Sequence, residues 1–209
     1  MSKSISRRVF GGATAGLVVG SPAELNAADE KKPEPPKGPV EAAFERSYPA
    51  PGFKPRWAKP QINRQMVQDF VIYAHSDLAM TKKLLEKEPA LLNATMDWGG
   101  GDWESGLGGA SHMGQKDIVA FLLESGARID IFCAAMLGQL EPVQALLAMQ
   151  PKLIDAKGPH GISLHIHAFM GGKDSEPLLE HLQSLKKIDL STSPFVKMKK
   201  AEAEKKKSK

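Results

Sequence analysis

The stretch AAMLGQLEPVQALL, residues 134–147, decides the fold that the sequence predicts. A short run of small and apolar residues ends at Gly138, and a second run carries Val143 and Leu147 one helical turn apart. This spacing predicts two short helices joined by a turn at the glycine. A pair of helices this short cannot cover its own apolar stripe, so neighbouring pairs have to stack and cover one another. The stretch therefore predicts one unit of a repetitive helical stack.

The same pattern recurs elsewhere along the chain. Residues 110–127 (ASHMGQKDIVAFLLESGA) repeat it with Gly114 at the turn, and residues 73–85 (YAHSDLAMTKKLL) repeat it with Ser76 at that position. A further copy runs through residues 161–182. Internal repeats of this kind form stacked arrays in which each unit contacts only its neighbours. The sequence therefore predicts an all-α fold.

The beginnings and ends of these copies resemble the ankyrin repeat family. Residues 161–168, GISLHIHA, are similar to its Gly-x-Thr-Pro-Leu-His-x-Ala-Ala opening, and residues 126–130, GARID, are similar to its Gly-Ala-Asp-x-Asn close. The resemblance spans about residues 69–185 and implies an ankyrin-like solenoid of about four helix-turn-helix repeats. It also implies a protein that binds other proteins, without catalytic residues or a cofactor of its own. In this family the histidine that matches His165 has a structural role in the turn between repeats.

Four segments follow from this interpretation. Residues 1–28 are predicted to be an export signal, because SRRVF at residues 6–10 is similar to the twin-arginine motif and precedes a glycine-rich apolar stretch; general secretion is the alternative. Residues 29–60 hold eight of the fifteen prolines and predict an extended linker, whose aromatic side chains we expect to pack onto the domain. Residues 61–190 are the repeat domain, and residues 191–209 are a flexible, lysine-rich tail predicted to be disordered, with a frayed helix as the alternative. The protein is thus expected in the periplasm or outside the cell.

Charge and composition exclude several classes of protein. The net charge of +4 comes from the two ends of the chain, and residues 28–196 carry a net charge of −3. A mildly acidic body predicts no nucleic-acid partner, although the lysine-rich tail could weakly contact anionic surfaces of the envelope. Cys133 is the only cysteine, which excludes an internal disulfide. No run reaches the roughly 18 apolar residues of a membrane-spanning helix, so we expect no transmembrane segment in the mature chain.

The loop DWGGGDWESGLGG, residues 97–109, is not explained by packing between repeats. Six glycines in thirteen residues cost backbone entropy and bury little surface. Tryptophan side chains often anchor protein interfaces. We therefore predict contacts with a protein partner, of a kind that the sequence does not specify, from Trp98, Asp102, Trp103, Glu104 and His160. The alternative is that both tryptophans fold back to cover a thin, glycine-rich helix.

The histidines support a competing interpretation, because imidazole is the commonest ligand of zinc in proteins. His160, His165 and His167 lie within eight residues, and His112 lies in another copy. If Ser163 caps a helix, His165 and His167 point about 200° apart and cannot both face one ion. We therefore predict no metal site, and the candidates for one, should it exist, are His160, His165, His167 and Asp97. A mixed oxygen and nitrogen site would form only if the fold brought the carboxylates of the loop to His160.

The sequence thus favours a non-enzymatic, exported module that presents a concave, loop-lined surface to a partner protein. The alternative is a metal-binding protein or metal-dependent hydrolase that uses residues 97–104 and 160–167. Cys133 lies in an apolar stretch and is interpreted as a small buried side chain rather than a nucleophile.

Overall fold

The computed structural model describes residues 40–207, apart from the side chains of residues 202, 206 and 207. The predicted export signal and the first part of the predicted linker, residues 29–39, lie outside the described residues. The chain divides into two units, residues 1–40 and 41–209. The helices and strands of the described residues all belong to the second unit. In the described part, no helix has the length and apolar character needed to cross a membrane.

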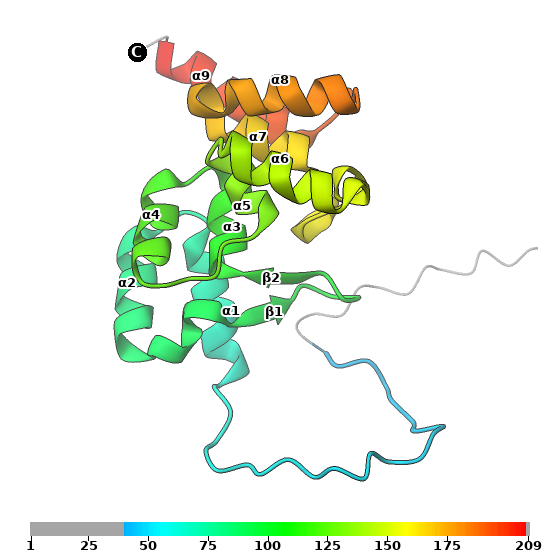
Figure 1. Ribbon diagram of the computed structural model, residues 1–209. Coiled ribbons are helices and arrows are strands. Elements are labelled where there is room, and N and C mark those ends of the chain that lie inside the picture. Colours follow the sequence, from blue (N-terminus) through cyan, green and yellow to red (C-terminus); the bar gives the residue numbers. More distant parts are fainter. Residues whose placement is uncertain (1–39, 208–209) are drawn as a thin grey trace, which may run out of the picture. The chain divides into compact units, whose positions relative to one another are not determined.

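Helices dominate this unit, as the sequence predicts, and they follow one another in pairs (Figure 1). The bounds of the paired helices are α1 Arg64–Ala74, α2 Leu78–Lys87, α3 Gly106–Met113, α4 Lys116–Glu124, α5 Ile131–Met136, α6 Leu140–Met149, α7 Leu164–Gly171 and α8 Glu176–Leu185. Short 3-10 turns lie between them, at Pro89–Asn93, Pro151–Asp155, Pro159–Gly161 and Gly172–Ser175. The first helix of each pair contacts the first helix of the next, so that α1, α3, α5 and α7 form one continuous row. The predicted stack of helical hairpins is present.

Local chemistry explains where the helices begin and turn. Side-chain oxygens of Asp77, Ser105, Asp130 and Ser163 accept backbone N–H groups in the first turns of α2, α3, α5 and α7. Such caps satisfy donors that a helix start leaves free. At the turn between α5 and α6, Gly138 has φ 71°, and a Cβ there would lie 2.4 Å from the carbonyl oxygen of Asp174. Only glycine meets both conditions.

The apolar core lies between the helix pairs, in two clusters of buried side chains. The first is centred on the large side chains of Phe70, Ile118 and Leu122, and the second on Leu164 and Leu178. Leu147, predicted from the repeat pattern to be a core residue, is buried in the second cluster. The apolar faces of neighbouring helix pairs therefore cover one another, as stacking requires.

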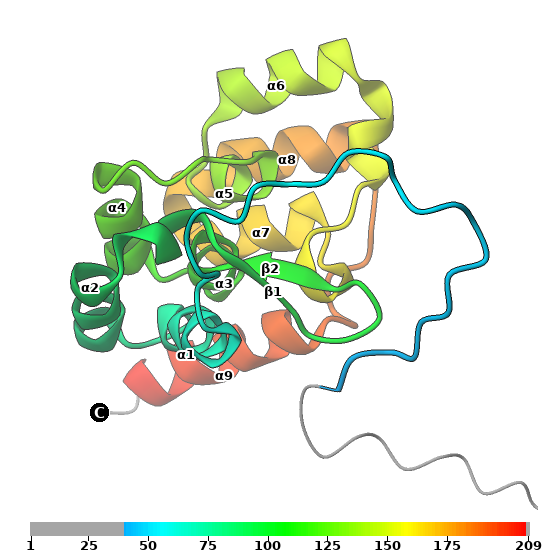
Figure 2. The same cartoon turned by 90° about the horizontal axis from the view of Figure 1, so that it is seen from below.

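A short hairpin adds strand to this otherwise helical unit. Strands β1 (Thr95–Asp97) and β2 (Trp103–Ser105) pair antiparallel, with Met96 opposite Glu104. The hairpin lies between α2 and α3 in the sequence and extends away from the helices (Figures 1 and 2). The loop that the sequence singled out is therefore partly an ordered hairpin.

Both ends of the unit differ from expectation. Residues 41–60 contain no helix or strand, and the aromatic side chains of this arm stay in solvent: Phe53 is 81% exposed and Trp57 71% exposed. The expectation that they pack onto the domain was wrong. At the other end, helix α9 (Pro194–Lys207) occupies most of the tail that was expected to be disordered. Its Val196 is buried and α9 contacts α7, because the first turn of this helix is apolar and finds a surface to cover.

Candidate metal centre

Four side chains from four separate segments converge beside the base of the hairpin. They belong to His75, which follows α1, to Glu104 in β2, to His112 in α3 and to His160 in the turn before α7. Each offers one ligand atom, and these atoms all lie within 4.8 Å of one another. Glu104 and His112 are buried, His75 is half-buried, and His160 lies at the exposed edge. We call these four residues the His₃Glu cluster.

Glu104 is the centre of the cluster. Successive side chains of a strand point to opposite faces, so Trp103 and Ser105 face one side of β2 while Glu104 faces the other and is buried. Its Oε2 accepts a hydrogen bond of 2.7 Å from the indole N–H of Trp98 and lies 3.3 Å from Nε2 of His75. The same Oε2 lies 3.4 Å from Nε2 of His160.

Two buried atoms in the cluster have no hydrogen-bond partner. Oε1 of Glu104 and Nδ1 of His112 are 3.0 Å apart, yet neither makes a hydrogen bond of acceptable geometry. A buried polar atom without a partner costs about 1–3 kcal/mol, so such atoms are rare in folded proteins. Both atoms face the space that the other two histidines also face, and a bound cation there would satisfy them together.

His75 is oriented by the helix that precedes it. Its Nδ1 lies 2.8 Å from the carbonyl oxygen of Val71, which can only accept a proton, so Nδ1 is the donor and Nε2 is left to face Glu104. The ring fits because α3 carries Gly109 beside it: a Cβ at that position would lie 2.6 Å from Cε1 of His75. Gly109 therefore leaves the room that the His75 ring needs.

His160 is held in place by the hairpin loop. Its backbone has φ 57°, a left-handed conformation that costs a non-glycine residue free energy. Asp102 offsets this cost through two contacts with His160. Its Oδ1 accepts the backbone N–H of His160 at 2.8 Å, and its Oδ2 lies 2.8 Å from Nδ1 of the ring. With Nδ1 donating to this carboxylate, Nε2 of His160 faces the cluster. A carboxylate behind a histidine is the usual partner of a metal-bound imidazole.

Aromatic rings cover the cluster. Trp98 meets the rings of His75 and His160 edge-on, with centroids 5.8 and 5.2 Å apart. On another side, Phe195 of α9 meets the ring of His112 edge-on at 5.4 Å. These rings reduce access of water, which strengthens electrostatic interactions inside the cluster.

The negative charge of Glu104 at neutral pH favours binding of a cation in the cluster. Burial alone would raise the pKa of Glu104, but the close polar contacts with His112 and His75 and the charges of these rings outweigh it and lower that pKa to about 2. Burial acts to lower the pKa of His75, and the interaction with Glu104 overcomes this and raises it. The carboxylate is therefore ionised at neutral pH, and in the absence of a metal it favours the protonated form of His75.

The spacing of the donor atoms also fits a small metal ion. Ligands at 2.0–2.1 Å in tetrahedral coordination are separated from each other by about 3.3 Å. The separations between Glu104 oxygens and the three imidazole nitrogens are 3.0, 3.3 and 3.4 Å. The four donor atoms, which lie within 4.8 Å of one another, would close around one ion by moving toward a common point.

The structure places only one of the four predicted metal candidates in the His₃Glu cluster. His160 belongs to the cluster, whereas Asp97, His165 and His167 do not. Asp97 accepts the backbone N–H groups of Gly99 and Gly101 at the tip of the hairpin. Nε2 of His165 lies 2.8 Å from the Lys186 carbonyl oxygen, and Nδ1 of His167 lies 2.9 Å from the Ser163 carbonyl oxygen.

The five residues predicted to contact a partner protein also differ in how accessible they are. Glu104 is buried at the centre of the cluster and offers no surface to a partner, so that prediction was wrong. Asp102 and His160 are bound to each other, and the indole N–H of Trp98 is used by Glu104. Trp103 is 59% exposed and remains available for contact.

His75 was not among the predicted site residues, and His112 was noted only as a histidine of another repeat copy. The available signal was the glycine pair Gly108–Gly109, which breaks the apolar repeat pattern at the level of His75. Fold and site together define a stack of helical hairpins that carries a buried cluster of three imidazoles and one carboxylate. No protein-family model matches the chain, and no curated protein matches it.

Proposed function

We propose that this protein binds one divalent transition-metal ion through His75, Glu104, His112 and His160, and that the ion is zinc. The observation that carries the proposal is the pair of buried, unpartnered atoms, Glu104 Oε1 and His112 Nδ1, that face one another across the cluster. A metal ion satisfies both at once, together with the two Nε2 atoms beside them.

A hydrogen-bonded network without a metal explains the cluster less well. Burying an ionised carboxylate is costly unless its charge is compensated. Protonated imidazoles could compensate it, but several of them within 4.8 Å would repel one another. A divalent ion compensates the carboxylate while the three imidazoles stay neutral, which is their state as metal ligands.

The donor atoms favour zinc over other ions. Calcium and magnesium take oxygen ligands, whereas three imidazole nitrogens with one carboxylate are a set used by zinc and its transition-metal neighbours. Thiolate chemistry is absent from this site, because burial raises the pKa of Cys133 to about 11 and its thiol is not part of the cluster.

The number of ligands favours a structural role for the ion rather than hydrolysis. Catalytic zinc sites leave one position open for water, whereas structural sites use four protein ligands. Four protein ligands around one ion fill a tetrahedron, so we propose a metal-binding protein that is not an enzyme. The ion would fix the hairpin and the turn at residues 159–161 against α1 and α3.

We also propose that the helix pairs are ankyrin-like repeats and that the protein is exported. The row of contacts among α1, α3, α5 and α7 supports the first proposal, together with the sequence resemblance. The arginine pair Arg7–Arg8 and the apolar stretch after it support the second. A metal acquired before export would be retained by a chain that crosses the membrane already folded.

Metal analysis of the purified protein tests the function. We expect about one equivalent of zinc after reconstitution and dialysis, and a higher melting temperature for the zinc-bound protein than for the chelated protein. His112→Ala should abolish both, whereas His181→Ala, which alters a histidine outside the cluster, should abolish neither. Absence of bound metal in the wild-type protein, with equal melting temperatures after zinc and after chelator, would overturn the proposal.

A further inference from the structure

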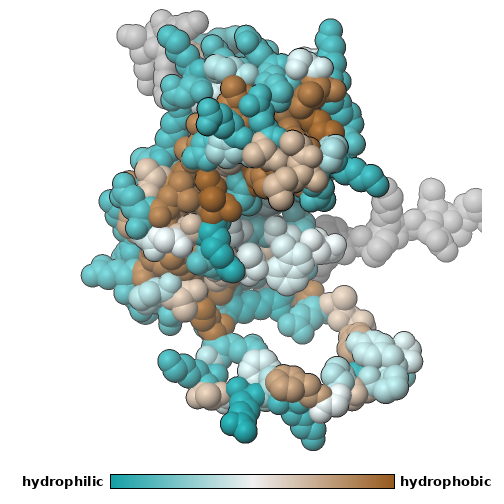
Figure 3. Space-filling model, viewed as in Figure 1, coloured by the Kyte–Doolittle hydropathy of each residue, from teal (hydrophilic) through white to brown (hydrophobic). Residues whose placement is uncertain are grey.

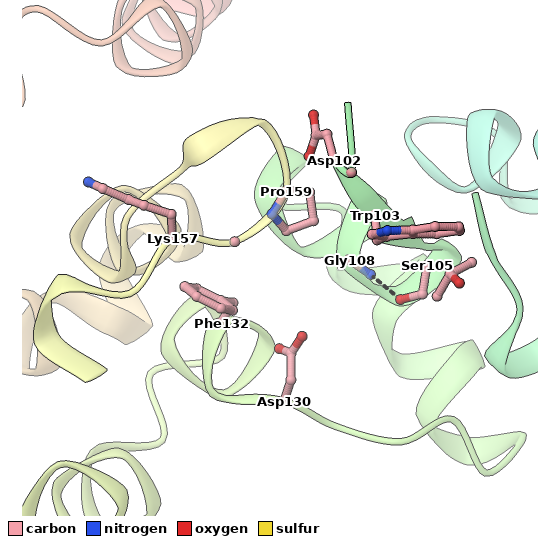
Figure 4. Close-up of a pocket in the computed structure, with 11 residues that line it drawn as sticks. Asp102, Trp103, Ser105, Gly108, Asp130, Phe132, Lys157 and Pro159 are labelled. Carbon is pink, nitrogen blue, oxygen red and sulfur yellow. Dashed lines mark hydrogen bonds between the residues drawn. The ribbon is translucent and has the colours of Figure 1, made fainter. Parts of the chain in front are cut away.

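A pocket lies on the other face of strand β2 from the His₃Glu cluster. Trp103 and Ser105 line it, whereas Glu104 between them faces the cluster. The opposite wall is formed by Lys157, Gly158 and Pro159, the three residues before His160. Figure 4 shows the pocket open between these walls, with Phe132 at the start of α5 on its lower side. Its volume of about 360 Å³ is within the range of small ligand sites.

Aromatic and glycine residues shape this pocket. Trp103 and Phe132 contribute ring surfaces, and in Figure 4 they lie on different sides of the open space. Gly101, Gly108 and Gly158 add no side chains, which leaves the space empty. An indole that is 59% exposed at such a place leaves apolar surface in water that a ligand could cover.

The charges around the pocket are unequal. Two carboxylates, Asp102 and Asp130, and one ammonium group, Lys157, line it. In Figure 4 the Lys157 side chain extends away from Trp103, whereas the Asp130 carboxylate points toward the space between Phe132 and Trp103. Oδ1 of Asp130 accepts the backbone N–H of Cys133 as a helix cap, so its charge stays fixed at the edge of the pocket.

We propose that this pocket binds the cationic end of an arginine or lysine side chain presented by a peptide segment of a partner protein. Ring faces attract guanidinium and ammonium groups, and a nearby carboxylate adds to that attraction. An anionic ligand would meet the Asp130 carboxylate and the negative faces of the rings. The stem of a long basic side chain would at the same time cover the exposed indole.

The side chains that carry the peptide proposal are not metal ligands. Asp102 and the turn before His160 line the pocket too, but Asp130, Phe132 and Trp103 make no hydrogen bond or ion pair to the four cluster residues. Substitutions at Trp103 and Asp130 should therefore leave metal content unchanged. This separates a failure of the peptide proposal from a failure of the metal proposal.

Binding of a short peptide to the full-length protein, measured with and without added zinc, tests the proposal. The probe is acetyl-Gly-Arg-Gly-amide, compared with the same peptide carrying citrulline, which has nearly the shape of arginine without its charge. Calorimetry and tryptophan fluorescence should show binding of the arginine peptide at least about tenfold tighter than the citrulline peptide. Free diamines are the third probe and should bind more weakly than the arginine peptide.

Two charge-removing variants give the sharpest result, because a cationic ligand predicts opposite signs for them. Asp130→Asn keeps an oxygen for the helix cap and should weaken binding severalfold, whereas Lys157→Gln removes a repulsive charge and should strengthen it. Trp103→Ala should abolish binding. Trp57→Ala, which removes a tryptophan of even greater exposure from the arm, should have no effect.

Equal binding of the citrulline peptide would overturn the proposal. So would weaker binding after Lys157→Gln, since that result indicates an anionic ligand. Tighter binding of free diamines than of the arginine peptide would overturn the assignment to a peptide partner. Folding of each variant is checked by its zinc content and melting curve, and Asp130→Asn keeps the test decisive if Trp103→Ala does not fold.

Discussion

Asp102 and His160 are joined by two contacts of 2.8 Å across 58 residues of sequence. One is a hydrogen bond from the backbone N–H of His160, which stabilises its left-handed conformation. The other involves Nδ1 of its ring and sets the tautomer, so that Nε2 is free of a proton and can bind a metal. The hairpin loop thereby orients His160, a candidate metal ligand that lies in a turn distant in sequence.

Asp102→Asn should weaken zinc binding about 10–100-fold, the usual effect of losing the partner of a metal-bound histidine. Asparagine can still accept the backbone N–H, but its amide would favour the tautomer of His160 that carries the proton on Nε2. Zinc titration against a competing chelator measures the affinity, and nitrogen chemical shifts of the imidazole in the metal-free protein report the tautomer. Asp97→Asn, in the same hairpin but outside the cluster, is the matched control. An unchanged tautomer with unchanged affinity would contradict this role of Asp102.

Two adjacent glycines of α3 should respond to alanine in opposite ways. A Cβ at Gly109 would lie 2.6 Å from His75, whereas the nearest atom to a Cβ at Gly108 would be Cγ of Glu104 at 3.4 Å, an ordinary contact. Gly108→Ala should therefore leave stability unchanged or raise it by up to about 1 kcal/mol, as alanine usually does in helices. Gly109→Ala should cost about 1–3 kcal/mol and weaken zinc binding, because the His75 ring must move.

Chemical denaturation and zinc titration of the two variants, made side by side, check this pair. Equal zinc affinities for the two variants would show that the room beside His75 is not needed for the metal site.

The stacked core predicts different costs for two neighbouring leucines of α6. Leu147 is buried in the second cluster, and Leu147→Ala should lower the free energy of unfolding by about 2–5 kcal/mol. Leu146 is 37% exposed, and Leu146→Ala should cost about 1 kcal/mol or less. Urea denaturation of both variants measures the difference. Similar costs for the two would argue against stacking of the α5–α6 pair on the α7–α8 pair.

His167 should make stability depend on pH in mildly acidic solution. Burial lowers its pKa to about 4, with a smaller lowering by His112, while the Ser163 carbonyl and Glu104 act in the opposite direction. Between pH 6.5 and 4, the unfolded chain binds a proton at this residue and the folded chain does not. The free energy of unfolding therefore falls as the pH falls, by about 1.4 kcal/mol per pH unit from this group, and the fall ends below its folded pKa.

His167→Asn tests this dependence, because it keeps a donor for the Ser163 carbonyl and cannot titrate. Denaturation of the metal-free wild type and variant between pH 7 and 4 gives the contribution of His167 by difference. This subtraction removes the effects of the other histidines. The difference should change with pH in the stated direction, and a constant difference would show that His167 is protonated in the folded protein.

The hairpin stack could be predicted because its determinants are local. Gly138, Val143 and Leu147 are close in sequence, and their spacing alone fixes the turn and the apolar stripe. The cap at Ser163, which the interpretation of the histidines assumed, is present at the start of α7. The tail was misjudged because the apolar residues Phe195 and Val196 are too few to show a periodicity.

The His₃Glu cluster could be predicted only in part because it depends on contacts between distant segments. Glu104 and His160 were both singled out as partner contacts, and a metal site shared by residues 97–104 and 160–167 was only the alternative, since nothing local brings these segments together. The pairing of Asp102 with His160 and the room left by Gly109 exist only in the folded chain. A search for glycines that interrupt the repeat pattern beside histidines would have pointed to His75 and His112.

The origin of the four donors in different segments affects how the whole array of helix pairs unfolds. Where helix pairs contact mainly their neighbours, the terminal pairs of an array can fray independently. His75, His112 and His160 come from the beginning, the middle and the far part of this array, and one ion ties them to a single point. Zinc would thus convert a chain of separately melting units into one that opens all at once, and protease sensitivity at its first hairpin would report whether its last is intact.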